Sequence, residues 1–192
     1  MKTLVRQAYA HLRERLPRFS YAQEGEDLVL ARLMEGISSG SFIDVGAHHP
    51  FRFSNTYYFY RRGWRGINID PNPAAMSLFR KHRPEDINIE AAVSDIEQEL
   101  EYFQFNDAAL NTFDKGLAQS REGAVYRIVS TKMVQSQLLR QVLLPHVESL
   151  KNLTFMSVDV EGLDINVLRS NDWGRICPQF VLAECLNTQL SD

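Results

Sequence analysis

Short apolar segments alternate along this chain with segments of helical periodicity, and this alternation constrains the fold more than any other feature. Residues 41–46 and 66–70, which read SFIDVG and GINID, are each long enough for one buried strand, and Gly46 and Pro71 end them. Residues 73–83 then carry apolar positions at helical spacing. Such alternation requires parallel strands joined by right-handed helical crossovers. The sequence therefore predicts an α/β fold with a mostly parallel, doubly wound, Rossmann-like sheet.

The same pattern continues toward the C-terminus, with one irregular stretch in the middle. Segments 100–105 and 125–130 have strand composition and flank polar residues, so they predict a hairpin-like excursion. The remaining predicted elements are, in chain order, a helix over 28–36, a short helix over 57–60, a strand over 87–93, a helix over 133–146, a strand over 153–160, a helix beginning within 161–172 and a strand over 179–184.

Size, charge and cysteine content narrow the class of protein. The chain has 192 residues, 44% of them hydrophobic, and is expected to form one core. Its net charge of -3 supplies no basic field for nucleic acid or an anionic membrane, so we expect a small-molecule partner. Cys177 and Cys185 match neither a disulfide framework nor a zinc-ligand spacing, which fits a reducing, cytoplasmic compartment. No apolar run approaches the ~20 residues of a transmembrane segment.

Residues 1–19 are expected to form an N-terminal arm, followed by one domain over 20–192. Basic residues surround an apolar stripe at helical spacing, which predicts a basic amphipathic helix. We expect this helix to pack on the domain, and a membrane-surface or partner-binding helix is the alternative. The stripe consists of Leu4, Val5, Ala8, Tyr9, Leu12 and Leu16.

The ends of the first two predicted strands carry residues suited to a nucleotide-like ligand. Gly46 permits a tight turn and close approach of the backbone, and Asp44 supplies a carboxylate that can orient the loop or face a cationic ligand group. Asp70 and the adjacent Pro71 end the second strand roughly 20 residues beyond that turn, near the spacing of the ribose-binding acid in dinucleotide folds. An ordinary turn with Asp70 as a helix cap is the alternative.

The segment after the third predicted strand is a candidate adenine site. Ala92 and Val93 are small and apolar and could line a flat ring, while Ser94 or Asp95 hydrogen-bonds its edge. The alternative is that these residues form only core and a turn.

Two carboxylates, Asp159 and Glu161, straddle the end of a later strand. With Gly162 beside them, they could orient an acceptor hydroxyl, take its proton or hold a divalent cation; capping of a helix N-terminus is the alternative. His48 is a second candidate general base because an imidazole titrates near neutral pH. Asn55 could reach the cofactor or the acceptor, or simply cap a helix. Adjacent histidines rarely share one metal ion, so no metal site is predicted.

Several blocks together resemble the FkbM-type methyltransferase family. They are SYAQEGED, FIDVGAHHP, SNTYYFYRRGWRGINIDPNP, AAVSD, NTF and SVDVEGLDINVLRSNDW, and they run from about Ser20 to Glu184. The resemblance implies a class I methyltransferase fold, S-adenosylmethionine as methyl donor, and a hydroxyl acceptor on a sugar, glycan or secondary metabolite. Carried over by position, it implies a first cofactor loop at Asp44, Gly46 and Ala47, a ribose acid at Asp70, an adenine neighbourhood at Ala92, Val93 and Ser94, and an acceptor side at Asp159 and Glu161.

The chain departs from the family pattern at two places. Many members have Asn and a later Gly in the first loop where this chain has His48, His49 and Pro50, so His48 is also expected to contact the cofactor. Class I methyltransferases add a hairpin after the fifth strand, whereas this chain stops about eight residues beyond Glu184. Either the fold lacks that hairpin or the sequence is incomplete, and a missing hairpin would leave an exposed sheet edge that favours homo-oligomers.

Two alternatives share the predicted fold. A nicotinamide-dependent oxidoreductase would also use Asp70, but the G-x-G-x-x-G pattern is missing after Gly46. A catalytically degenerate binding or assembly module would keep the cofactor site without turnover.

Overall fold

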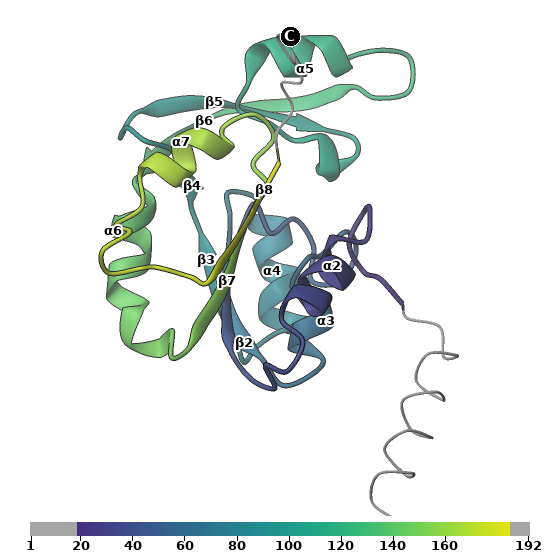
Figure 1. The fold of residues 1–192 in the computed structure, drawn as a ribbon. Coiled ribbons are helices and arrows are strands. Elements are labelled where there is room, and N and C mark those ends of the chain that lie inside the picture. Colours follow the sequence, from purple (N-terminus) through teal and green to yellow (C-terminus); the bar gives the residue numbers. More distant parts are fainter. Residues whose placement is uncertain (1–18, 185–192) are drawn as a thin grey trace, which may run out of the picture.

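A central sheet of five parallel strands organises the computed structural model, which describes residues 19–184 (Figure 1). The strand order is β3-β2-β1-β7-β8. The strands are β1 (Ser41–Val45), β2 (Arg65–Asp70), β3 (Ile87–Glu90), β7 (Leu153–Val158) and β8 (Phe180–Ala183). The predicted Rossmann-like α/β fold is confirmed. The arm predicted over 1–19 lies, apart from Phe19, outside the described residues.

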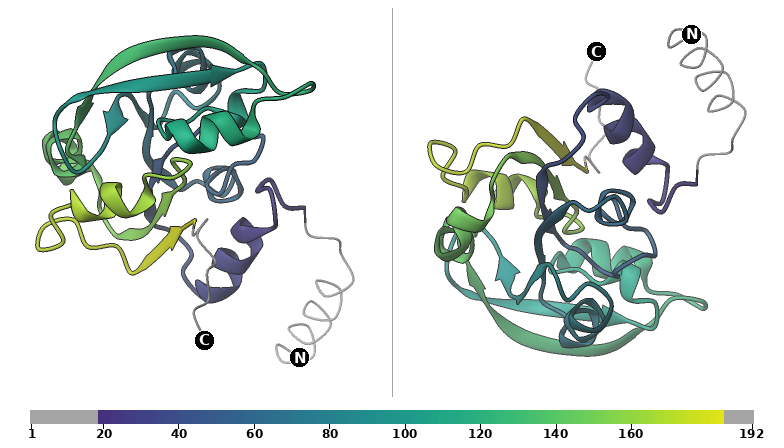
Figure 2. Two further views of the ribbon diagram at one scale, coloured as in Figure 1. Left: turned by 90° about the horizontal axis from the view of Figure 1, so that it is seen from above. Right: turned by 90° about the horizontal axis from the view of Figure 1, so that it is seen from below.

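Helices cover both faces of this sheet (Figures 1 and 2). On one face lie α2 (Glu26–Leu33), α3 (Tyr57–Tyr60) and α4 (Pro73–His82), and on the other lie α6 (Leu139–Leu143) and α7 (Asp164–Arg169). Asn72 begins α4 by accepting a hydrogen bond from the Ala74 N–H, and a proline at the first helical position supports that start. No helix in the part of the chain that the structure describes is both long and apolar enough to cross a membrane.

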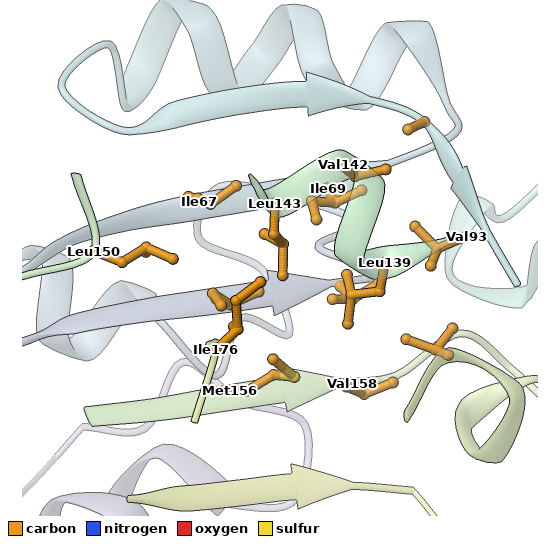
Figure 3. Close-up of a cluster of buried hydrophobic side chains, with 14 residues drawn as sticks. Ile67, Ile69, Val93, Leu139, Val142, Leu143, Leu150, Met156, Val158 and Ile176 are labelled. Atoms are coloured by element: carbon orange, nitrogen blue, oxygen red, sulfur yellow. The ribbon is translucent and has the colours of Figure 1, made fainter. Parts of the chain in front are cut away.

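Alternate residues of β1 point to the two helical layers, as the period of a strand requires. Phe42 packs with Leu30 of α2 and with Phe59 of α3. Ile43 belongs to the core cluster that contains Leu139 and Leu143 of α6. Figure 3 shows its neighbours Ile67 of β2 and Met156 of β7 in this cluster. Because both faces are buried, β1 is apolar except at Ser41 and at Asp44 near its carboxyl end.

A second sheet lies beyond the carboxyl ends of the central strands (Figures 1 and 2). It joins β4 (Ala92–Val93), β6 (Ile128–Gln137) and β5 (Glu99–Phe105) in that order, with β5 and β6 antiparallel. Between β5 and β6 the chain forms η1 (Ala108–Leu110) and α5 (Lys115–Arg121). We call residues 92–137 the roof. It confirms the predicted hairpin-like excursion.

Two predicted elements near the roof were wrong in their extent. The helix expected over 133–146 is a strand as far as Gln137, because β6 pairs along its length with β5, and Val134 lies opposite Leu100. Only α6 and the 3-10 helix η2 (Leu144–Ser149) remain of it. The strand expected over 87–93 divides at Ala91, so that β3 joins the central sheet and β4 joins the roof.

Candidate functional site

A cleft opens between the carboxyl ends of the central strands and the roof, where parallel α/β sheets bind their ligands. One part of it, which we call the inner cleft, spans about 730 Å³ of space that includes open solvent. The outer cleft adjoins it and shares the Asp159 and Glu161 wall. The inner cleft is lined by Gln23, Glu26, Gly46, His48, Phe53, Asn55, Asp70, Pro71, Tyr102, Ala108, Ala109, Asn111, Phe113, Asp159, Val160 and Glu161.

The turn after β1 is held against both neighbouring strands. The N–H groups of Gly46 and Ala47 donate to the carbonyl of Ile69 on β2, and the Asp159 N–H donates to the carbonyl of Val45. Gly46 has φ 80°, and a Cβ atom there would lie 1.7 Å from the carbonyl oxygen of Asp159. Only glycine therefore fits this position, both for its backbone angle and for its close approach to the chain after β7.

Asp70 lies at the end of β2 and orders the loop after β1. Its Oδ2 accepts the His48 N–H at 2.9 Å, and its Oδ1 accepts the Asn72 N–H at 2.8 Å. Burial raises the pKa of the Asp70 carboxyl to about 6, although these two backbone hydrogen bonds act in the opposite direction. A carboxylate has about four lone-pair sites, so two remain for donors of a ligand.

Three carboxylates gather where the inner and outer clefts meet. An oxygen each of Asp159, Glu161 and Glu184 lies within 4.8 Å of the others. Asp159 is exposed to solvent by its surface area, although surrounding protein atoms crowd its carboxylate. Removal from bulk water, followed by the charges of Glu161 and Glu184, raises the pKa of Asp159 to about 8. Glu161 also pairs with Arg121 of α5 at 2.5 Å.

The sequence matches the family model described as the Methyltransferase FkbM domain over residues 44–189. The chain belongs to this family. Comparison with curated proteins and with solved structures gave no match. Family membership makes the chain a methyltransferase, and it favours this activity over the alternative of a nicotinamide-dependent oxidoreductase.

Most of the predicted site residues of this methyltransferase lie together in the inner cleft. Gly46, His48, Asn55, Asp70, Pro71, Asp159 and Glu161 all line it. Asn55 comes from the loop before α3, and its Nδ2 donates to Ser157 Oγ of β7 at 3.0 Å. The structure thus brings residues from β1, β2 and β7 to one wall, as their positions at strand ends predict.

Five predicted residues lie behind or beside the cleft lining. Asp44 is buried beneath the turn, where its Oδ2 accepts the Thr56 hydroxyl at 2.7 Å, and Ala47 packs against Met76 and Phe79. The other three, Ala92, Val93 and Ser94, are buried in and after β4. Val93 belongs to the core cluster between the central sheet and α6 (Figure 3). An adenine-binding role for these three stays a prediction.

His48 has a left-handed backbone conformation, which is uncommon for a residue other than glycine. Its φ is 53°, in the left-handed region, where Asn, Asp and His are enriched among non-glycine residues. Phe53 and Glu161, which also line the inner cleft, share this conformation with φ of 55° and 53°. Such strained residues cluster at ligand sites. Burial, with the charges of His49 and Arg52, lowers the pKa of His48 to about 4, so its imidazole is neutral at pH 7.

The roof contributes cleft residues that sequence reasoning missed. Tyr102 and Phe113 lie with ring centroids 4.6 Å apart, and the Asn111 side chain donates to the Tyr102 hydroxyl at 3.1 Å. Asn111 and Phe113 belong to the NTF block, but nothing local in the sequence places them opposite Asp70. Burial, together with the charge of Asp70, raises the pKa of Tyr102 above its usual value.

Polar contacts connect the roof to the loops that follow β1 and β7. Arg52, in the loop after β1, pairs with Asp107 of the roof at 3.3 Å. The Thr112 hydroxyl donates to the Glu161 carbonyl at 2.7 Å. These contacts hold Tyr102 and Phe113, which we call the aromatic wall, over the ends of the strands.

Proposed function

We propose that this methyltransferase uses S-adenosylmethionine and methylates a hydroxyl group of a sugar, glycan or secondary metabolite. The observation that carries the proposal is the position of Asp70. It lies beside the Gly46 turn, faces the inner cleft and has two free acceptor positions, as a ribose with two adjacent hydroxyls requires.

The residues of the inner cleft fit this cofactor on three counts. Gly46 lines the inner cleft with backbone atoms alone, as close approach of a ligand to the turn requires. Asp70 can accept both ribose hydroxyls. Within residues 19–184, His48 Nε2 is buried without a hydrogen-bond partner, which leaves it for a polar group of a ligand.

We assign the adenine to the aromatic wall of the roof. Tyr102 and Phe113 line the same cleft as Asp70 and present apolar ring surface, which suits a flat base. Ala92, Val93 and Ser94 would then support the wall from behind through the pairing of β4 with β6.

The acceptor is proposed to enter through the outer cleft and to meet Asp159. When bound, S-adenosylmethionine supplies a methyl group on a positively charged sulfur, and the acceptor oxygen bonds to this carbon as the carbon–sulfur bond breaks. Positioning of the oxygen in line with that bond supplies much of the acceleration. Asp159 is the proposed general base because it lies at the junction of the two clefts, and Glu161 is proposed to orient the acceptor. His48, also a candidate base from sequence, is assigned to the cofactor side because its pKa is far below 7.

Calorimetry with S-adenosylmethionine and with S-adenosylhomocysteine tests the cofactor. We expect both to bind, and no binding of either by the intact chain would refute the proposal. Transfer of a labelled methyl group to a panel of sugars, glycans and secondary metabolites then tests the reaction. Binding of both cofactor forms without transfer to any member of the panel would favour a catalytically degenerate binding module.

A further inference from the structure

The layer of α2, α3 and α4 buries a charged side chain, Arg83, that the proposed reaction does not use. Arg83 follows α4 and is 0% exposed. Its guanidinium lies near three aromatic rings, with its Cζ atom 5.3 Å from the centroid of Phe42, 4.9 Å from that of Tyr60 and 5.1 Å from that of Phe79. Burial of a charge is costly unless that charge is paired and hydrogen-bonded. The polar contacts of the Arg83 guanidinium therefore indicate why it is buried here.

One side of the guanidinium is bound by Asp86. Arg83 Nε donates to Asp86 Oδ2 at 2.8 Å, and this carboxylate also accepts the Gly66 N–H and the Asn68 side-chain amide of β2. Asp86 is therefore held from two directions and neutralises the arginine. The contacts of Asp86 would be enough if the Arg83–Asp86 pair only stabilised the layer of α2, α3 and α4.

The other side of the guanidinium reaches toward the proposed cofactor site. Arg83 Nη1 donates to Thr56 Oγ1 at 3.0 Å, and the Thr56 hydroxyl lies 2.7 Å from Asp44 Oδ2. A hydroxyl has one proton. Thr56 accepts from Arg83, which has only donors, so its own proton goes either to Asp44 Oδ2 at 2.7 Å or to Ser54 Oγ at 3.3 Å; the shorter contact to a carboxylate takes it. The hydrogen bonds thus run from Arg83 to Thr56 and from Thr56 to the Asp44 carboxylate. We call this chain of two hydrogen bonds the relay.

This direction matters because Asp44 lies in an unfavourable place for a charge. Burial raises the pKa of Asp44, while the Thr56 hydrogen bond and the charge of Arg83 lower it. Three other acids interact with Asp44 through charge repulsion, namely Asp86, Asp70 and Asp159. Within residues 19–184, the charge of Arg83 lowers the pKa of Asp44, and the charge of Asp86 opposes it.

We propose that Thr56, whose hydroxyl is oriented by Arg83, is a positioning residue for the cofactor site that holds Asp44 beneath the Gly46 turn. The link to cofactor binding rests on the proposed function. The relay itself does not, because it can be observed in the free protein. The relay joins three segments that are distant in sequence: the end of β1, the loop before α3 and the end of α4.

The Thr56→Val variant tests the relay because it keeps the shape of the side chain and removes the hydroxyl. The carboxyl carbon of Asp44, assigned by comparison with Asp44→Asn, is followed by NMR over a pH titration of the whole chain. We expect its midpoint to rise by about one pH unit in Thr56→Val and to return toward the wild-type value in Thr56→Ser, which keeps the hydroxyl. The affinity for S-adenosylmethionine at pH 7 should fall about tenfold in Thr56→Val only.

Thr154→Val is the matched control. Thr154 is also buried, but its hydroxyl donates to the Asn152 carbonyl at 2.9 Å, away from Asp44. This variant should lose stability to urea without moving the Asp44 midpoint. An Asp44 midpoint in Thr56→Val equal to that of the wild type would overturn the relay. Absence of cofactor binding by the wild type would refute the proposed function and leave the NMR result standing.

Discussion

Gly46 and the carbonyl group of Asp159 lie in direct contact, so the turn after β1 and the chain leaving β7 are packed as one unit. The two residues are far apart in the sequence, yet the turn proposed to bind the cofactor and the proposed base share this contact. A side chain at position 46 would have to separate them. The contact therefore couples the geometry of the proposed cofactor side to that of the proposed acceptor side.

Gly46→Ala should be strongly destabilising. The added Cβ would lie 1.7 Å from the Asp159 oxygen, and the φ of 80° is unfavourable for alanine. We expect a loss of about 3 kcal/mol or more in the free energy of unfolding, measured by urea denaturation. Gly63→Ala is the control, because its φ is 89° and nothing lies within 4 Å of a Cβ there. That variant should lose only about 1–2 kcal/mol. Equal losses in the two variants would contradict the contact.

Asp70→Asn should weaken the binding of S-adenosylmethionine by about 100-fold, because a charged acceptor of two hydroxyl groups becomes a neutral amide. Wild-type affinity should also fall as the pH drops below about 6, where Asp70 takes up a proton, and this dependence should be lost in the variant. Calorimetry over a series of pH values measures both effects.

Glu90→Gln serves as the control for Asp70. Glu90 is the register partner of Asp70 on β3, but its side chain is exposed and does not line either cleft. Its removal changes the local charge equally and should leave cofactor affinity within about twofold. A comparable loss in both variants would mean that general electrostatics, and not ribose binding, explains the effect.

The central sheet could be predicted from the sequence because its signals are local. A strand buried on both faces is a short apolar run, as in β1 and β2, and its end is visible where Gly46 or Pro71 follows. Parallel topology then brings strand ends to one edge. Asp70 and Asp159 could therefore be placed in one site before their contacts were known.

The roof could be predicted only in outline because its signals are not local. Residues 133–137 have no sequence feature that marks them as strand, and their pairing with β5 decides their conformation. Tyr102 and Phe113 face Asp70 only because that pairing folds the roof over the strand ends. The left-handed backbone of His48 was equally hidden, because few non-glycine residues adopt it and nothing in the sequence marks which of them do.

Stability should decrease as the pH rises from about 6.5 to about 8. The pKa of Asp159 is raised to about 8, so in this range the folded chain holds a proton that the unfolded chain releases, and the free energy of unfolding falls with pH. Below pH 6.5 the lowered pKa of His48 opposes this trend, because there the unfolded chain binds the additional proton. Urea denaturation at several pH values should show the decrease, and Asp159→Asn should reduce it. A variant with the same slope as the wild type would rule out Asp159 as its source.

Asp159→Asn should also lower the rate of methyl transfer by about 10²- to 10⁴-fold, since it removes the proposed general base. In the wild type, kcat/KM for S-adenosylmethionine should rise with pH through about 8, as Asp159 loses its proton in the free enzyme. Glu184→Gln provides the sharper comparison. Glu184 raises the Asp159 pKa by its charge, so its removal should move the rise to lower pH while the reaction continues. A rise that stays in place in Glu184→Gln and persists in Asp159→Asn would assign the base to another group.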